Sequence, residues 1–362
     1  MSDPTSIQGT PPGVPPQSPK WPAPAAEPRE TRGVAFVVAI FLGILLVASA
    51  GLNVLLLFVS VGSVAGGGLG SVDGTYEKVH AGGERGADKK VLRVSIHGAI
   101  AESASPLMGA GGGTVSLVER ALRQAEQDQV HGILLDIDSP GGGVTDSDEI
   151  YRMIRKYREK HPDVKVASLF GDISASGGYY VAAASERIFA RRTTITGSIG
   201  VIMSSYNFAK LAQTYGVEEI AIKSARTPMK DILSTMRPMR DDEKALLTGI
   251  VDELFDQFVS VVDEGRPNLD REQVLKAATG AVYTASQAQQ LGLVDEIGDL
   301  DGTLAWFEGQ LGGKVELIEL RRRPGLGDLL FGGAAASSPD LAAQLLLQSS
   351  GPRFLYFWQG GR

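Results

Sequence analysis

The sequence predicts an α/β protein with a largely parallel sheet behind one N-terminal transmembrane helix. Two observations carry this prediction. Short apolar runs typical of strands alternate with runs of helical spacing through the middle of the 362-residue chain. Near the N-terminus, the apolar run Val34–Val59 is interrupted only by Gly43, Ser49, Gly51 and Asn53.

The N-terminal region divides into a polar tail and an apolar run. Residues 1–32 hold nine of the chain's 18 prolines and few aliphatic side chains, so we predict a disordered tail. As a helix, Val34–Val59 would extend about 39 Å, more than the roughly 30 Å of a bilayer's hydrocarbon core. A cleaved signal peptide is the alternative, but the run is too long for one. The nearby Arg29 and Arg32 favour a cytoplasmic N-terminus.

Composition and motifs exclude several classes of function. A net charge of −7 and the lack of a basic stripe argue against a nucleic-acid partner. Neither an H-E-x-x-H motif nor a Walker-type lysine occurs, so we expect no metal and no nucleotide cofactor. The absence of cysteine fits an oxidising compartment as well as a reducing one.

Regular patterning begins after a glycine-rich tether. We predict strands at 91–96, 132–138, 164–170 and 217–222, and helices at 115–125 and 145–160. Strands that alternate with helices form parallel sheets with right-handed crossovers. The carboxyl ends of strands 132–138 and 164–170 should therefore lie at the same edge, where ligand sites of open α/β folds occur.

Two glycine-bearing turns meet at that edge. Ser176 lies at a strand-to-helix junction, where the N–H groups of Gly177 and Gly178 lack intrahelical partners. The other strand ends in Asp138-Ser-Pro-Gly-Gly-Gly143. A serine hydroxyl beside convergent backbone donors is what acyl transfer requires, namely a nucleophile and an oxyanion hole. A helix cap and an ordinary turn are the alternative interpretations.

A serine nucleophile needs a base. None of the four histidines is predicted to lie near Ser176, so a Ser-His-Asp triad is disfavoured; they are His80, His97, His131 and His161. From the residues alone, Lys223 and Lys230 compete for the role of base. A lysine amine is normally protonated at neutral pH, and burial in an apolar pocket is one way to remove that proton.

Five motifs in order resemble the signal peptide peptidase A (protease IV) family in its short bacterial form. They are Asp138–Gly143, Ala175–Tyr180, Thr196–Met203, Lys223-Ser with Lys230-Asp231, and Ala288–Gly298. The resemblance covers roughly residues 89–311. The segment from Lys223 to Lys230 is two residues longer than the family's usual loop and contains a proline.

The resemblance implies a ClpP/crotonase-like spiral of ββα units and a serine protease with a Ser-Lys dyad. By position, Ser176 matches the nucleophile and Lys230 the general base. The amides of Gly142 and Gly177 match the oxyanion donors, and Ser198 matches a hydroxyl that orients the lysine. The family also implies homo-oligomeric rings that degrade signal peptides at the bacterial cytoplasmic membrane, with the catalytic domain outside the cytoplasm and no cofactor.

The predicted domain organisation follows from these assignments. It comprises a tail at 1–32, a transmembrane helix at 33–62, a linker at 63–88, a protease domain at 89–311 and an extension at 312–362. The aromatic segment Arg353–Trp358 could be a strand docked on the body, an oligomer contact or a membrane-surface contact. Two rival functions remain open: a crotonase-type acyl-CoA enzyme and a catalytically silent membrane scaffold.

Overall fold

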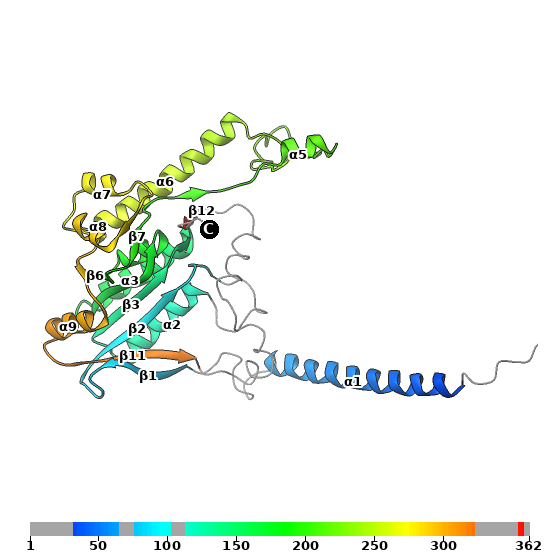
Figure 1. Ribbon diagram of the computed structural model, residues 1–362, viewed down its shortest axis with the longest axis horizontal. Coiled ribbons are helices and arrows are strands. Elements are labelled where there is room, and N and C mark those ends of the chain that lie inside the picture. Colours follow the sequence, from blue (N-terminus) through cyan, green and yellow to red (C-terminus); the bar gives the residue numbers. More distant parts are fainter. Residues whose placement is uncertain (1–31, 65–75, 103–112, 323–353, 358–362) are drawn as a thin grey trace, which may run out of the picture. The chain divides into compact units, whose positions relative to one another are not determined.

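The computed structural model describes residues 32–64, 76–102, 113–322 and 354–357 (Figure 1). The chain divides into two compact units, Met1–Leu69 and Gly70–Arg362. In the first unit, helix α1 spans Arg32–Val64. Its described side chains, those of residues 36–51 and 53, are exposed. No helix among the described residues is both long and apolar enough to cross a membrane. Residues 1–31 of the predicted tail lie outside the described residues.

The second unit is built on a nine-stranded mixed sheet. Its central order is β1-β11-β2-β3-β5-β6-β10, with β7 beside β5 and β9 beside β7. The strands are β1 (Tyr76–Gly83), β2 (Lys89–His97), β3 (Gly132–Ser139), β5 (Lys165–Ala175), β6 (Arg187–Ala190), β7 (Ile195–Gly197), β9 (Val282–Thr284), β10 (Glu296–Ile297) and β11 (Val315–Arg322). The pairings β1·β11 and β7·β9 are antiparallel and the others are parallel. The predicted α/β class and parallel core are confirmed.

A second, three-stranded antiparallel sheet has the order β4-β12-β8. Its strands are β4 (Gly141–Gly143), β8 (Ile202–Met203) and β12 (Phe354–Phe357). The middle strand is therefore the aromatic segment near the C-terminus. Of the interpretations open for that segment, the structure supports a strand docked on the body.

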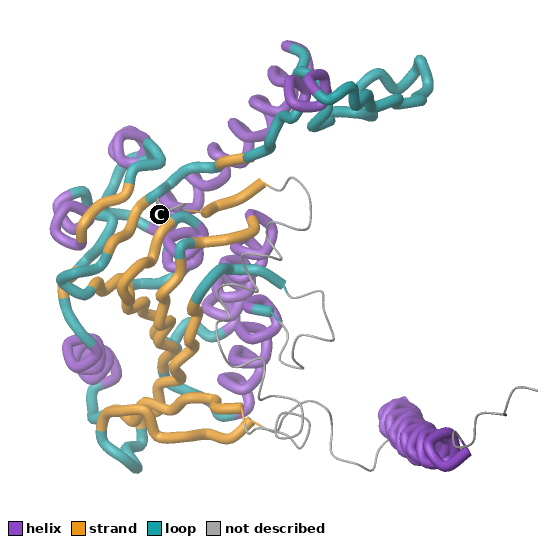
Figure 2. The backbone as a smooth tube through the Cα atoms, turned by 45° about the vertical axis from the view of Figure 1, so that its right-hand side comes forward, coloured by secondary structure: helices purple, strands orange, loops and turns teal. Residues whose placement is uncertain are grey.

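Helices cover both faces of the main sheet (Figures 1 and 2). The second unit's helices are α2 (Thr114–Gln127), α3 (Val144–Lys160), α4 (Gly177–Ala182), α5 (Ala209–Thr214), α6 (Asp241–Gly265), α7 (Arg271–Ala277), α8 (Ala285–Gln290) and α9 (Leu300–Leu311). Residues of α2, α3, α4 and α6 join the larger core with Ile133, Leu135 and Ile137 of β3. Leu134 points to the other face and packs with Phe307 of α9. Burial on both faces explains why β3 is a continuous apolar run.

Two predicted boundaries and one predicted strand differ from the structure. The predicted linker at 63–88 contains β1, an edge strand whose partly exposed side chains give no clear apolar alternation. The predicted extension from residue 312 contains β11, which lies between β1 and β2 and buries Val315 and Leu317. The strand predicted at 217–222 is wrong: this segment has no strand partner, and Ile222 is 96 % exposed.

A buried ion pair fixes the end of α6 to the strands. The Arg266 guanidinium is 2 % exposed and donates to both Asp295 oxygens, at 2.8 and 2.6 Å. Asp295 also accepts from the Ile188 N–H of β6 at 2.7 Å. Bidentate charge-assisted bonds of this kind are strong and geometrically specific. The pair thus joins α6, β6 and the turn before β10.

Asp295→Ala is expected to lower the free energy of unfolding by about 3 kcal/mol, because the Arg266 charge would stay buried without its partner. The matched control is the next residue, Glu296, whose ion pair with Arg187 is largely exposed. Glu296→Ala should cost less than about 1 kcal/mol. Urea denaturation monitored by circular dichroism measures both variants, and equal losses would contradict the assignment.

Candidate functional site

The parallel pairing of β3 with β5 brings the two predicted turns to one edge of the sheet. The strands run in register from Gly132↔Lys165 to Ile137↔Phe170, and Ser139 then pairs with Ser174. Beyond these last partners, β3 leads into β4 and β5 leads to Ser176. The expectation that both turns share an edge is confirmed.

An irregularity in β5 sets the path of the chain toward Ser176. Between Phe170 and Ser174 the strand holds more residues than the facing stretch of β3, which is a bulge. The Ile173 N–H donates to Asp138 Oδ1 at 3.0 Å. Gly171 passes so close to Asp138 that a Cβ there would lie 2.7 Å from the Asp138 Cβ. A larger residue at 171 would therefore displace this contact.

Ser176 adopts a backbone conformation that is rare for a residue with a side chain. It precedes α4 with φ 54° and ψ −116°, the region of the first central residue in a type II′ turn, where glycine is preferred. Its N–H donates to Gly197 O at 2.8 Å, and its C=O accepts from the Tyr180 N–H at 2.9 Å. Such strain persists only where the surrounding structure enforces it, and it concentrates at functional sites.

Gly177 follows as the first residue of α4 and is buried. Its N–H belongs to the first turn, so it has no acceptor within the helix. A hydrogen bond anchors helix α4 to the segment before β10: the buried Tyr179 hydroxyl donates to Leu293 O at 2.8 Å. Burial raises the pKa of Tyr179, which keeps this hydroxyl protonated as a donor.

Gly142 lies in β4 between two bonds to Ile100. Gly143 N–H donates to Ile100 O at 2.9 Å, and Ile100 N–H donates to Gly141 O at 2.9 Å. Backbone groups alternate sides along a strand, so the Gly142 N–H points away from Ile100. A Cβ on Gly142 would lie 1.9 Å from the Ile100 carbonyl oxygen. The close approach of Ile100 therefore requires glycine here.

Ser198 lies just beyond the strand that flanks Ser176. Ala175 of β5 pairs with Gly197 of β7, so Ser176 and Ser198 follow from adjacent strand ends. Ser198 also has a positive φ of 51°, is 7 % exposed, and donates its N–H to Ala281 O at 2.7 Å. Ser198 also lines a groove of about 590 Å³. The residues that line this groove are 198–202, 278–280, Val251, Asp252 and Phe255.

Lys230 lies on the arm, which we define as residues 204–240. Figure 2 shows the arm extending beyond the N-terminal end of α6. Its regular secondary structure consists of the short helix α5. The Lys230 side chain is exposed, whereas Ser176 is 1 % exposed, and among the described residues no hydrogen bond joins the two.

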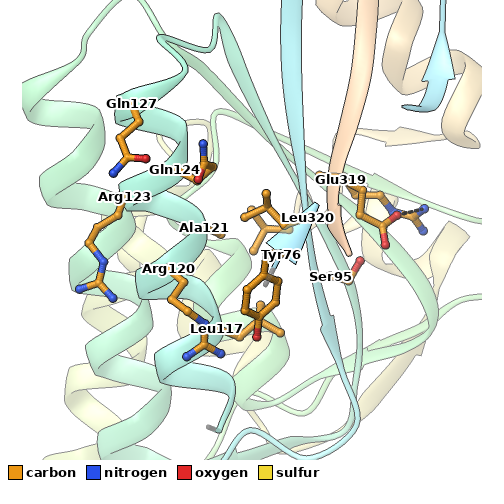
Figure 3. A pocket seen from close by; sticks show the side chains of 12 residues that line it. Tyr76, Ser95, Leu117, Arg120, Ala121, Arg123, Gln124, Gln127, Glu319 and Leu320 are labelled. Carbon is orange, nitrogen blue, oxygen red and sulfur yellow. Dashed lines mark hydrogen bonds and ion pairs between the residues drawn. The ribbon is translucent and has the colours of Figure 1, made fainter. Parts of the chain in front are cut away.

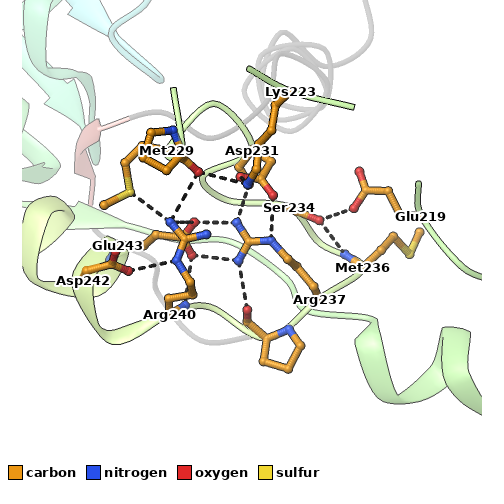
Figure 4. A network of polar contacts seen from close by, with 12 residues as sticks. Glu219, Lys223, Met229, Asp231, Ser234, Met236, Arg237, Arg240, Asp242 and Glu243 are labelled. Carbon is orange, nitrogen blue, oxygen red and sulfur yellow. Dashed lines mark hydrogen bonds and ion pairs between the residues drawn. The ribbon is translucent and has the colours of Figure 1, made fainter. Parts of the chain in front are cut away.

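An ion-pair network holds the loop that carries Lys230 (Figure 4). Arg237 donates to Asp231 at 3.0 Å and to Glu243 at 2.9 Å, and Lys223 also pairs with Asp231. The hydrogen bonds from Lys223 and Arg237 hold the pKa of Asp231 well below its usual range. Bonds from Arg237 and from the Arg240 backbone lower the pKa of Glu243 to about 2. Sequence reasoning missed this network, because charged residues in a loop carry no pairing signal.

The network distinguishes the two candidate lysines. The Lys223 amine is engaged, since it pairs with Asp231 and donates to Pro228 O at 3.0 Å. The Lys230 amine has no hydrogen bond or ion pair to any described residue. Of the two, Lys230 is free to meet another group.

The four histidines lie elsewhere. His80 contacts Glu316, His97 contacts Asp136, His131 accepts from the Lys90 N–H, and His161 packs on Tyr157. The hydrogen bond to Asp136 raises the pKa of His97. None of these partners belongs to the candidate site.

A separate pocket of about 270 Å³ lies between α2 and strands β2 and β11 (Figure 3). Its lining includes Tyr76, Leu117 and Leu320, together with the polar residues Arg120 and Glu319. It contains none of the predicted site residues. Within the described ranges, no group of three or more His, Asp or Glu side chains could hold a metal ion.

Comparison with known proteins gives a consistent family. Residues 158–313 match the model of peptidase family S49. The chain is 40 % identical to "Putative protease slr0021" of Synechocystis sp., over 64 % of this chain and 78 % of that relative. It is 36 % identical to "Putative signal peptide peptidase SppA" of Enterococcus faecium, over 59 % of this chain and 62 % of that relative. A solved structure of a ClpP1 mutant from Listeria monocytogenes aligns with a TM-score of 0.38 and 18 % identity, over 58 % of this chain and 93 % of that one.

The strain at Ser176 predicts an unusual order of stabilities. Ser176→Gly should be more stable than Ser176→Ala by about 1 kcal/mol, because only glycine adopts this backbone conformation without a steric cost. Both variants lack the hydroxyl, so the comparison isolates the backbone. Urea denaturation gives the two free energies of unfolding, and an alanine variant as stable as the glycine variant would refute the strain.

Proposed function

The chain belongs to peptidase family S49, and from that premise we propose that it is a membrane-anchored serine endopeptidase working through a Ser176–Lys230 dyad. The family resemblance inferred from the sequence motifs is confirmed. Family membership favours peptide hydrolysis over the two rival functions, an acyl-CoA enzyme and a silent scaffold. The dyad, the anchor and the substrates form the proposal.

The observation that carries the proposal is the strained backbone of Ser176 between two sets of backbone donors. The Gly177 N–H follows it directly, and β4 presents the Gly142 N–H on the side that faces away from Ile100. Preorganised donors of this kind stabilise the negative charge that develops on a carbonyl oxygen under attack. A strained turn that presents a serine beside such donors suits a nucleophile better than a simple helix cap.

The proposed reaction is acyl transfer to Ser176 followed by hydrolysis of the acyl-enzyme. The neutral Lys230 amine takes the proton of the Ser176 hydroxyl while Oγ attacks the peptide carbonyl carbon. The resulting oxyanion accepts hydrogen bonds from Gly142 and Gly177. The C–N bond then breaks, and the leaving amine receives the proton from Lys230. Water, deprotonated by the same amine, hydrolyses the acyl-enzyme and restores Ser176. Ser198 is proposed to orient the Lys230 amine.

The exposure of Lys230 favours a dyad formed between two copies of the chain. The arm exposes large apolar side chains, including Tyr206, Tyr215 and Ile220 at 77–81 %. Large exposed apolar side chains gathered on one segment favour a protein-protein contact. An arm docked on a neighbouring copy would bury these side chains and bring Lys230 to that copy's Ser176. A ring of copies, as expected for the family, would repeat this contact.

The membrane anchor and the substrates complete the proposal. The apolar run Val34–Val59 of the sequence lies within α1 and supports a role as a single-pass anchor, and the described apolar side chains of this helix are 49–73 % exposed. We place the N-terminus in the cytoplasm and the catalytic unit outside it, at a bacterial cytoplasmic membrane. The name of the E. faecium relative and the apolar lining of the groove at Ser198 support signal peptides and other small apolar peptides as substrates. The ClpP/crotonase-like spiral likewise remains part of this proposal.

Ser176→Ala is expected to abolish labelling by an acylating serine probe and to lower peptide hydrolysis by roughly a thousandfold or more. The matched control is Ser205→Ala, which removes an exposed hydroxyl of the arm and should leave labelling intact. Mass spectrometry of the labelled peptide identifies the modified residue. Unchanged labelling of Ser176→Ala would place the nucleophile elsewhere.

Mixing two inactive variants tests whether the dyad forms between copies. In an equal mixture of Ser176→Ala and Lys230→Ala chains, about a quarter of the interfaces would join an intact serine to an intact lysine. We therefore expect activity to recover to roughly a quarter of that of the unmodified protein. The control is an equal mixture of Ser176→Ala with Lys223→Ala, which keeps both proposed dyad residues, so this mixture should show roughly half the activity of the unmodified protein. A dyad formed within one copy predicts no recovery with Lys230→Ala.

A further inference from the structure

The pocket between α2 and strands β2 and β11 lies where the main sheet opens (Figure 3). The parallel pairing of β11 with β2 ends at Glu319↔Arg93, although β11 continues to Arg322 and β2 to His97. Beyond that pair, β11 remains paired with β1, and β2 remains paired with β3. The two strands therefore separate, and among the described residues no other strand fills the gap between them.

The apolar part of the lining combines buried and accessible side chains. Val94 and Ala121 belong to the larger core, and Leu320 packs against it. Leu117 and Tyr76 are each 37 % exposed, so a ligand can reach them. The volume of about 270 Å³ is slightly below the range of typical small-molecule sites, which begins at about 300 Å³. The pocket therefore suits a short apolar group.

Arginine dominates the charged part of the lining. The charged lining residues are Arg93, Arg120, Arg123 and Glu319. Arg93 pairs with Asp136 and Glu319. Arg123 pairs with Glu119 at 2.6 Å, and both of these side chains are more than half exposed. Carboxylates of the chain therefore engage two of the three guanidinium groups.

Arg120 presents its charge in a different setting. Its guanidinium lies over the ring of Tyr76, with Cζ 5.4 Å from the ring centroid. An aromatic ring fixes the position of an arginine, whose planar fork of N–H donors matches the geometry of a carboxylate. Gln124, also on α2, lines the same pocket and adds amide donors (Figure 3). The pocket thus combines apolar surface with donors for a planar anion.

We propose that this pocket binds a small monocarboxylate with a short apolar chain. The carboxylate accepts hydrogen bonds from Arg120, and the chain packs against Leu117, Ala121 and Leu320. Free fatty acids and the C-terminal ends of short apolar peptides share this chemistry. The lining contains none of the proposed catalytic residues, so the site is independent of the proposed peptidase activity. A bound ligand would contact α2, β2 and β11 together at the gap in the sheet.

Octanoate and octanamide are matched probes, because they share one chain and only octanoate is charged. In isothermal titration calorimetry of the full chain, octanoate should bind roughly tenfold more tightly than octanamide, since charge-assisted hydrogen bonds are the stronger ones. Arg120→Gln should remove this preference. The control is Arg123→Gln on the same helix, which removes an arginine that Glu119 already engages and should keep the preference.

Hydrogen exchange measured by mass spectrometry locates the binding. Octanoate should slow exchange in segments 114–127 and 315–322 of the unmodified chain, and should not do so in Arg120→Gln. The same protection is expected in Ser176→Ala, so the result does not depend on catalysis. N-acetyl-dileucine with a free carboxylate is the second probe. Tighter binding than octanoate would assign the natural ligand to peptide ends, and weaker binding would assign it to fatty acids.

A second variant keeps the inference testable if Arg120→Gln disturbs the fold, as circular dichroism would show. Leu117→Asp places a negative charge on a partly exposed lining residue and should weaken octanoate binding more than octanamide binding. Equal affinities of the unmodified chain for octanoate and octanamide would overturn the inference. Protection by octanoate confined to segments outside the pocket would overturn it as well.

Discussion

The hydrogen bond from the Ile173 N–H to Asp138 ties the end of β5 to the end of β3, and the position of Ser176 follows from it. Without the bulge, β3 and β5 would keep the same pairing register up to this edge of the sheet. With the bulge, Ser174 pairs with Ser139, and the chain reaches Ser176 beside Gly197 of β7. The turn at Ser176 is then closed on one side by that strand and on the other by α4. The strained backbone conformation persists because buried neighbours fix the chain on both sides.

Much of this arrangement could be predicted from the sequence, because it depends on local patterns. The apolar run of β3, the amphipathic helix α3 and the glycine turns at 141–143 and 177–178 are short-range signals, and the parallel βαβ rule brings their ends together. Strands β1 and β11 could not be predicted in the same way. They pair with each other across most of the unit's sequence, and β1 has no buried face of its own to reveal it. The segment 217–222 shows the opposite error: its β-branched residues Val217, Ile220 and Ile222 are typical of a strand, but among the described residues no strand pairs with it.

The candidate site likewise has one part that could be predicted from the sequence and one part that could not. Ser176, Gly142 and Gly177 follow from adjacent strand ends, so sequence reasoning could place them together. The lysine could not be placed, because the arm belongs to no strand or long helix and its position depends on ion pairs among Lys223, Asp231, Arg237 and Glu243. These pairs fix the loop internally, yet they leave the Lys230 amine without a partner among the described residues. A loop held by ion pairs that presents a free amine on an arm with exposed apolar side chains makes sense if, as proposed, the partner group lies on another copy of the chain.

The glycines of β4 carry two different constraints, and together they define the site. One edge of β4 is filled by Ile100, which approaches so closely that Gly142 can have no side chain. The other edge must then offer its N–H to something else, because a buried donor without an acceptor is costly. In the free enzyme that acceptor has to be water, a peptide or another part of the chain. The pairing of β12 with this edge supplies one, and an oxyanion in the reaction would supply another. The same open edge therefore accounts for the proposed oxyanion donor and for the pairing of β4 with β12.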